Sequence, residues 1–131
     1  MKDRLSELSE LWFVRAEDDL SWAEDSFKDG HFGGTCFLSQ QIVEKALKAY
    51  LFFQKQKLIR THNLERLLAK CLEFDKQFIK LKKSCQILTD YYIDTRYPDI
   101  WDYNQFDDKK FARQALDLAK IVVEFLRKKL K

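Results

Sequence analysis

TCFLSQQIVEKALKAYLFFQKQ, residues 35–56, is the stretch that decides the fold. At 3.6 residues per turn, its apolar side chains cover nearly the whole circumference of a helix. Only the arc that holds Gln41, Lys45 and Lys48 is polar throughout. A helix that is apolar all round is buried on several sides. We therefore expect this helix at the centre of the molecule, where it also meets a partner.

Two polar residues, Gln40 and Glu44, fall inside the apolar arc of this helix, close to Leu47 and Leu51. Buried polar groups need hydrogen-bond partners, so we predict that both side chains bond to fixed groups elsewhere in the chain. Glu44 and Lys48 also form a favourable pair four residues apart. A buried network that fixes the helix register and a catalytic role are equally compatible with this pattern.

Apolar residues at three- and four-residue steps predict four more helices. They cover residues 6–28, a shorter segment that opens at residues 62–64, residues 77–95 and residues 108–129. Residues 30–34 are expected to separate the first two helices, with Thr35 starting the second. Asn63 or Thr61 can cap the short helix, and Asp107 the last one. The predicted fold is all-α, an up-and-down helical bundle of four long helices plus a shorter one, in a single domain over residues 1–131.

Leu11, Val14 and Trp22 lie off the apolar stripe of the first helix. An off-stripe tryptophan with two aliphatic neighbours predicts a second contact, either with a further helix or with another subunit.

The net charge of +3 conceals a strong segregation along the chain. Residues 1–43 and 84–108 each carry a net charge of −5, whereas residues 44–83 carry +7 and residues 109–131 carry +6. Complementary helix faces within a bundle or dimer account for this pattern. A polyanion-binding stripe formed by the two basic segments is the alternative.

Several classes of protein are not indicated by the sequence. Three cysteines without CxxC spacing are expected to be buried free thiols, and the two histidines have no metal-ligand spacing, so we predict neither a metal nor another cofactor. No apolar run approaches the length of a membrane span, and residues 1–10 lack the apolar core of a signal peptide. A cytoplasmic location is the expectation.

Residues 89–106, TDYYIDTRYPDIWDYNQF, carry the first candidate for function. Pro98 predicts that a helix stops near Tyr97. Arg96 is the single basic residue between Ser84 and Asp108, and it either forms a salt bridge to a nearby aspartate or contacts a ligand. The tyrosines and Trp101 of this stretch are expected in the core or at a dimer contact more readily than stacked on bases.

The order of these motifs resembles the HEPN domain family over essentially the whole chain. The resemblance is carried by AEDDLSWA (16–23), CFLSQQIVEKALKAYL (36–51), THNLERLL (61–68) and YYIDTRYPD (91–99), followed by an amphipathic last helix dotted with alanines. It implies a helical bundle that dimerises and that is commonly encoded beside a minimal nucleotidyltransferase, as a toxin–antitoxin pair. Some members of the family cut RNA without a metal.

The ribonuclease members carry an arginine followed four to six residues later by a histidine, and only the arginine is matched, by Arg96. Trp101 stands where the histidine is expected, whereas Tyr103 matches a tyrosine that the partner enzyme adenylylates in some members. Histidine suits proton transfer near neutral pH, and losing one general acid/base typically reduces a rate by about 10² to 10⁴. The resemblance therefore implies a ligand site more strongly than catalysis.

Three hypotheses follow for the function. The first is a homodimeric HEPN module, paired through residues 35–56 and the Arg96 loop, that binds RNA or a nucleotide and works with a nucleotidyltransferase. The second is a metal-independent endoribonuclease that uses Arg96 at a dimer cleft, and the third is a catalytically silent interaction module. The candidate site residues are Arg96, Tyr97, Asp99, Tyr103, Glu44, Lys45 and Lys48.

Overall fold

The computed structural model describes residues 3–96 and 108–131, and for residues 92–96 it describes the main chain only. Five α-helices and one 3₁₀ helix make up this part of the chain, which contains no strand. They are α1 (Arg4–Lys28), α2 (Phe32–Phe53), α3 (Leu64–Leu72), η1 (Lys76–Leu81), α4 (Lys82–Arg96) and α5 (Lys109–Lys129). The predicted all-α bundle is confirmed.

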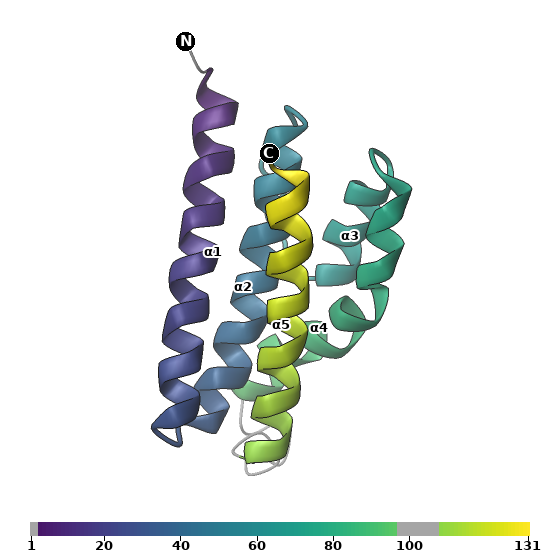
Figure 1. The fold of residues 1–131 in the computed structure, drawn as a ribbon. Coiled ribbons are helices and arrows are strands. Elements are labelled where there is room, and N and C mark those ends of the chain that lie inside the picture. The colour runs from purple at the N-terminus through teal and green to yellow at the C-terminus, as the bar shows by residue number, and fades with distance from the viewer. Residues whose placement is uncertain (1–2, 97–107) are drawn as a thin grey trace.

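Helix α2 lies at the centre of the bundle. The long helices α1 and α5 lie against it, and α3, η1 and α4 cover its other side (Figure 1). Of the 22 residues of α2, only Gly34 and Phe53 are exposed. The expected central position is therefore confirmed. The chain's own helices already cover the apolar circumference of α2, so its burial needs no second subunit.

The connection between α1 and α2 is shorter than predicted. α2 begins at Phe32, so Gly33 and Gly34 lie inside the helix and the expected restart at Thr35 is wrong. Gly30, whose φ is 81°, takes the left-handed conformation that ends α1. Thr35 instead lies one turn inside α2, and its hydroxyl donates to the main-chain oxygen of His31 at 3.0 Å.

The later helices differ from the predictions mainly at their first turns. Residues 76–81 form a 3₁₀ helix, in which buried Phe78 and Leu81 fall on one side because that helix has three residues per turn. Asn63 caps α3 as predicted, accepting from the main-chain nitrogen of Arg66 at 3.1 Å. Asp108, and not Asp107, caps α5. Residue 107 lies outside the described residues.

The structure describes α4 up to Arg96, and the predicted stop near Tyr97 falls at residues outside the described ones. The three cysteines are free and buried, as predicted. Burial raises the pKa of Cys71 and raises that of Cys85 to about 12, with smaller contributions from neighbouring groups. Both thiols are therefore protonated at neutral pH.

One face of α1 is exposed and makes no contact with another described helix. We call Leu11, Val14 and Trp22 the α1 outer face; their side chains are 48%, 51% and 69% exposed. The predicted second contact with another helix of the same subunit is therefore not made by these three residues. No helix in the described ranges is long and apolar enough to cross a membrane.

Candidate functional site

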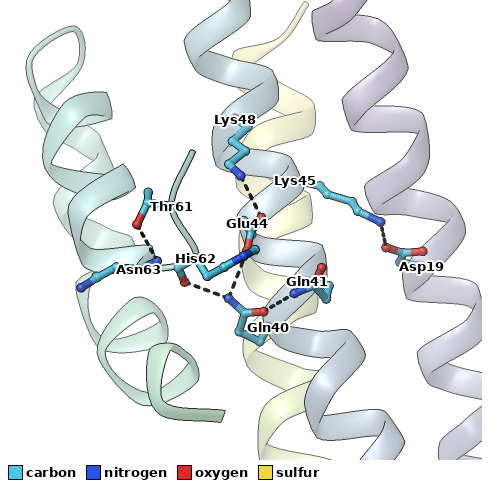
Figure 2. A network of polar contacts seen from close by, with 9 residues as sticks. All are labelled: Asp19, Gln40, Gln41, Glu44, Lys45, Lys48, Thr61, His62 and Asn63. Carbon is cyan, nitrogen blue, oxygen red and sulfur yellow. Dashed lines mark hydrogen bonds and ion pairs between the residues drawn. The ribbon is translucent and has the colours of Figure 1, made fainter. Parts of the chain in front are cut away.

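A cluster of polar side chains lies on α2, beside the connection that leads to α3. It comprises Gln40, Gln41, Glu44, Lys48 and His62, and we call it the Glu44 cluster (Figure 2). Gln40 is fully buried, and Glu44 and Lys48 are only 5% and 6% exposed. Charged residues are almost never buried unless they are paired, which makes this cluster the most unusual part of the core.

The carboxylate of Glu44 receives hydrogen bonds from three side chains. Lys48 Nζ donates to one oxygen at 2.8 Å, while the other oxygen lies 2.8 Å from His62 Nδ1 and 3.4 Å from Gln40 Nε2. Because an ionised carboxylate only accepts hydrogen bonds, Nδ1 of His62 is the donor. The predicted bonding of Glu44 to fixed groups is confirmed, and its partner His62 comes from outside the helix.

Gln40 ties the same connection to α2 by a second route. Its Nε2 atom donates to the main-chain oxygen of His62 at 3.0 Å, and its Oε1 atom accepts from Gln41 Nε2 at 2.7 Å. The main chain of His62 is therefore held to α2 independently of its imidazole. The prediction that Gln40 is hydrogen-bonded is confirmed.

Lys45 and Lys48, both predicted on the polar arc and both candidate ligand contacts, are paired within the chain. Lys48 is buried between Glu44 and the ring of Trp12, whose centroid lies 5.4 Å from Nζ. Lys45 forms an ion pair with Asp19 of α1 at 2.5 Å. The predicted pairing of Glu44 with Lys48 is confirmed, although Trp12 and Glu44 bury Lys48.

The accessible member of the Glu44 cluster is His62. Its side chain is 54% exposed, whereas that of its partner Glu44 is 6% exposed. A buried carboxylate thus fixes the orientation of an imidazole that ligands can approach. With Nδ1 directed at Glu44, Nε2 is the ring nitrogen that points away from this carboxylate.

The register between α3 and α4 relates His62 to Arg96. The main-chain nitrogen of Leu64 donates to Thr89 Oγ1 at 3.1 Å, so Thr89 lies beside the start of α3. The backbone of Arg96 comes seven residues later, on the same face of α4 and about 10 Å further along its axis. The side chain of Arg96 and the residues Tyr97, Asp99, Trp101 and Tyr103 lie outside the described residues.

Some of the segregated charges pair within the subunit. Arg127 of α5 donates to Glu17 of α1 at 2.9 Å, and Lys120 lies 3.7 Å from Glu24. These contacts support the interpretation of complementary helix faces for α1 and α5. Among the described residues, no group of three or more histidine, cysteine, aspartate or glutamate side chains is arranged to hold a metal ion.

Comparisons with known proteins agree with this architecture. The family model described as HEPN domain matches residues 9–129. A protein of Methanocaldococcus jannaschii named "Putative toxin MJ1304" is 24% identical over 137 residues, covering 92% of this chain and 90% of its own length.

Two solved structures share the fold. That of TT1696 from Thermus thermophilus has a TM-score of 0.85 and 30% identity, over 92% of this chain and 97% of that chain. That of ST0689, titled an archaeal HEPN homologue, has a TM-score of 0.76 and 27% identity, over the full length of both chains.

Proposed function

The chain belongs to the HEPN domain family, and from that premise we propose that it is the RNA- or nucleotide-binding component of a two-gene, toxin–antitoxin-like system. The second gene would encode a minimal nucleotidyltransferase. The relative named "Putative toxin MJ1304" matches over 92% of the chain, which supports the proposal at the level of the whole domain. Because RNA and a nucleotidyltransferase of this kind are cytoplasmic, we propose that the protein acts in the cytoplasm.

The observation that carries the proposal is the half-exposed imidazole of His62, held by the buried carboxylate of Glu44. This imidazole belongs to the connection that leads into α3. The start of α3 is bonded to Thr89 of α4, and Thr89 lies about two helical turns before Arg96 on the same helix. We propose that the ligand binds between His62 and Arg96. Arg96 would contact a phosphate group of the ligand, because a guanidinium stays charged and forms bidentate hydrogen bonds with phosphate.

The other candidate residues take different roles in this proposal. Glu44 and Lys48 act through His62, Glu44 by orienting the ring and Lys48 by balancing the buried carboxylate. Lys45 would have to leave Asp19 in order to reach a ligand. Tyr97, Asp99 and Tyr103 follow Arg96 in the chain and remain proposed contacts, with Tyr103 as the proposed site of adenylylation.

Binding of a labelled single-stranded RNA of mixed sequence, and of ATP, tests the ligand site. Arg96→Ala should weaken binding of the responding ligand about tenfold or more, as loss of a charge-assisted contact does. Arg113→Ala is the matched control, because Arg113 is an exposed arginine on α5. Equal affinities for all three proteins would remove Arg96 from the site.

Co-expression with the product of the adjacent gene tests the two-gene proposal. An adenylyl group on Tyr103, detected by mass spectrometry, would support a modified toxin. Co-purification of the unmodified chain, without RNA binding, would favour the catalytically silent interaction module. A neighbouring gene that encodes no nucleotidyltransferase would remove the proposed partner.

We propose that the active form is a homodimer, as in the first hypothesis, but with α1 in place of residues 35–56 at the contact, because the chain's own helices cover α2. The exposed α1 outer face supports a subunit contact there, in addition to the proposed contact at the Arg96 loop. Light scattering at micromolar concentration should give twice the mass of the chain, and Trp22→Ser should shift the equilibrium towards the monomer. A monomeric wild-type protein would contradict the shared-cleft proposal.

A metal-independent endoribonuclease is the second candidate, because His62 offers an imidazole that residues 101–103 lack. The 2′-hydroxyl oxygen would attack the adjacent phosphorus while its proton passes to His62. The bond to the 5′-oxygen would then break, and that oxygen would take a proton from water. The products are a 2′,3′-cyclic phosphate and a 5′-hydroxyl.

Incubation of RNA in EDTA tests this second candidate. His62→Gln should reduce cleavage by about 10² to 10⁴, and Arg96→Ala should also reduce it. His31→Gln is the matched control, because His31 lies outside the Glu44 cluster. The absence of cleavage by the wild-type protein would exclude the enzyme and leave the binding proposal intact.

A further inference from the structure

A groove lies between η1 and the C-terminal half of α5, away from the Glu44 cluster. Its volume is about 580 Å³, and we call it the lysine groove. It is lined by Gln77, Lys80, Leu81, Lys120, Ile121, Glu124, Phe125, Lys128 and Lys129. The groove brings together the two basic segments of the sequence, which contribute residues to its opposite walls.

The floor of the groove is apolar and firmly supported. Ile121 is 54% exposed, and Phe125, one helical turn later, is partly buried. The ring of Phe125 packs edge-on against that of fully buried Phe78, with centroids 4.9 Å apart. An exposed isoleucine beside an anchored aromatic ring is a surface that favours an apolar ligand group.

Four lysines surround this apolar floor, against one acidic residue, Glu124. Lys129 is held by Asp75 at 2.7 Å and lies 5.4 Å from the centroid of Phe125, so it joins the two walls. Lys120 is paired with Glu24 of α1. Within the described part of the chain, exposed Lys80 and Lys128 form no ion pair, which leaves two cations at the rim for a ligand.

The combination of an apolar floor and a basic rim identifies the class of ligand. An RNA backbone would use the lysines but would gain little from Ile121. A second copy of this chain carries an acidic, partly apolar helix, α1, but that helix packs on α2 of its own subunit, and its Glu17 and Glu24 pair with α5. Because these contacts already engage α1, a separate acidic helix suits the groove better.

We infer that the lysine groove docks an acidic amphipathic helix of a different protein. The apolar residues of this partner helix, spaced three or four apart, contact Ile121 and Phe125, and the carboxylates of the partner helix contact Lys80 and Lys128. This inference rests on the proposed function only in requiring a partner protein. It is independent of the ligand site at His62 and Arg96.

Titration of ¹⁵N-labelled protein with designed peptides tests the inference. The probe is an acidic amphipathic helix built from leucine and glutamate, compared with a scrambled peptide of the same composition and with single-stranded RNA. The acidic helix should shift the amide signals of η1 and of residues 120–129. Ile121→Ser and the double variant Lys80→Glu, Lys128→Glu should each weaken binding about tenfold.

Matched controls lie outside both the groove and the α1 outer face. Leu58→Ser removes an exposed apolar side chain from the connection between α2 and α3, and Lys110→Glu reverses a lysine at the other end of α5. Both should leave the peptide affinity unchanged. Three results would each overturn the inference. They are equal binding of the scrambled peptide, binding of RNA in the groove with an affinity that Ile121→Ser does not change, and no binding of the acidic helix. Because Arg96→Ala is measured separately with RNA, such a failure is distinguishable from failure of the proposed function.

Discussion

The Glu44 cluster and the lysine groove both contain lysines from the basic segment that spans residues 44–83, yet they use them in opposite ways. Lys48 is 6% exposed and bonded to Glu44, whereas Lys80 is exposed at the rim of the groove. A buried charge stabilises the fold only with its partner in place, while an exposed one contributes little to stability and remains available to a ligand. The net charge of a segment therefore does not show which of its cations can bind.

The largest expected effect follows from breaking the buried pair. Glu44→Ala leaves the ammonium of Lys48 buried without its carboxylate and removes the partner of His62. Removing one member of a buried ion pair typically costs about 3–5 kcal/mol, so the free energy of unfolding in urea should fall by that amount. Glu73→Ala, at an exposed glutamate, is the control.

A double variant separates the charge from the packing. Glu44→Leu combined with Lys48→Leu removes both ions at once, and it should be closer to the wild type in stability than Glu44→Ala. If the single variant loses less than about 1 kcal/mol, a typical net hydrogen bond, the view that Glu44 compensates a buried cation is wrong.

His62→Gln should have a smaller effect on stability. The connection stays attached to α2 because Gln40 donates to the main-chain oxygen of His62, whichever side chain that residue carries. We expect a loss of about 1 kcal/mol in the free energy of unfolding, the net value of one hydrogen bond. A loss as large as that of Glu44→Ala would show that the imidazole serves the fold, and it would weaken the ligand proposal.

Charge reversal in the lysine groove should hardly change stability. Lys80→Glu with Lys128→Glu alters two exposed side chains that form no ion pair in the described part of the chain. The melting temperature should stay close to that of the wild type, since such surface changes are usually within about 0.5 kcal/mol. A marked loss of stability would mean that the groove belongs to the fold and not to a docking site.

The smallest effect concerns Asp75, which joins η1 to the end of α5. The hydrogen bond from Lys129 is the main cause of the lowered pKa of Asp75. Because the folded-state pKa lies below the ordinary 3.8, this stabilisation is present above that value and is lost as the pH falls through the lowered pKa. Asp75→Asn should therefore reduce the acid-induced loss of stability slightly, as seen in urea unfolding at neutral and acidic pH.

Much of the fold could be predicted from apolar spacing and capping residues. As predicted, the apolar stripe of α1 is buried, α2 is buried around its circumference, and Asn63 caps α3. The errors lie where local propensity competes with packing. Gly33 and Gly34 are helical because the neighbouring turns of α2 are buried against α1, and a propensity argument does not contain that contact.

The site was only half predictable for a related reason. Buried Gln40 and Glu44 had to find partners, but the sequence did not show that His62, 18 residues away from Glu44, would be one of them. One feature of the sequence did point to His62. It immediately precedes Asn63, the cap of α3, so its position relative to the start of that helix is fixed. The burial of Lys48 depends on Trp12, a contact that spans two helices.

Binding of labelled single-stranded RNA to the wild type, Arg96→Ala and His62→Gln tests the central claim most directly. The claim is that the Glu44 cluster presents His62 to a ligand that Arg96 also holds. Both variants should retain the fold by circular dichroism and bind about tenfold more weakly, while Arg113→Ala binds like the wild type. Undiminished binding by His62→Gln and Arg96→Ala would contradict the account.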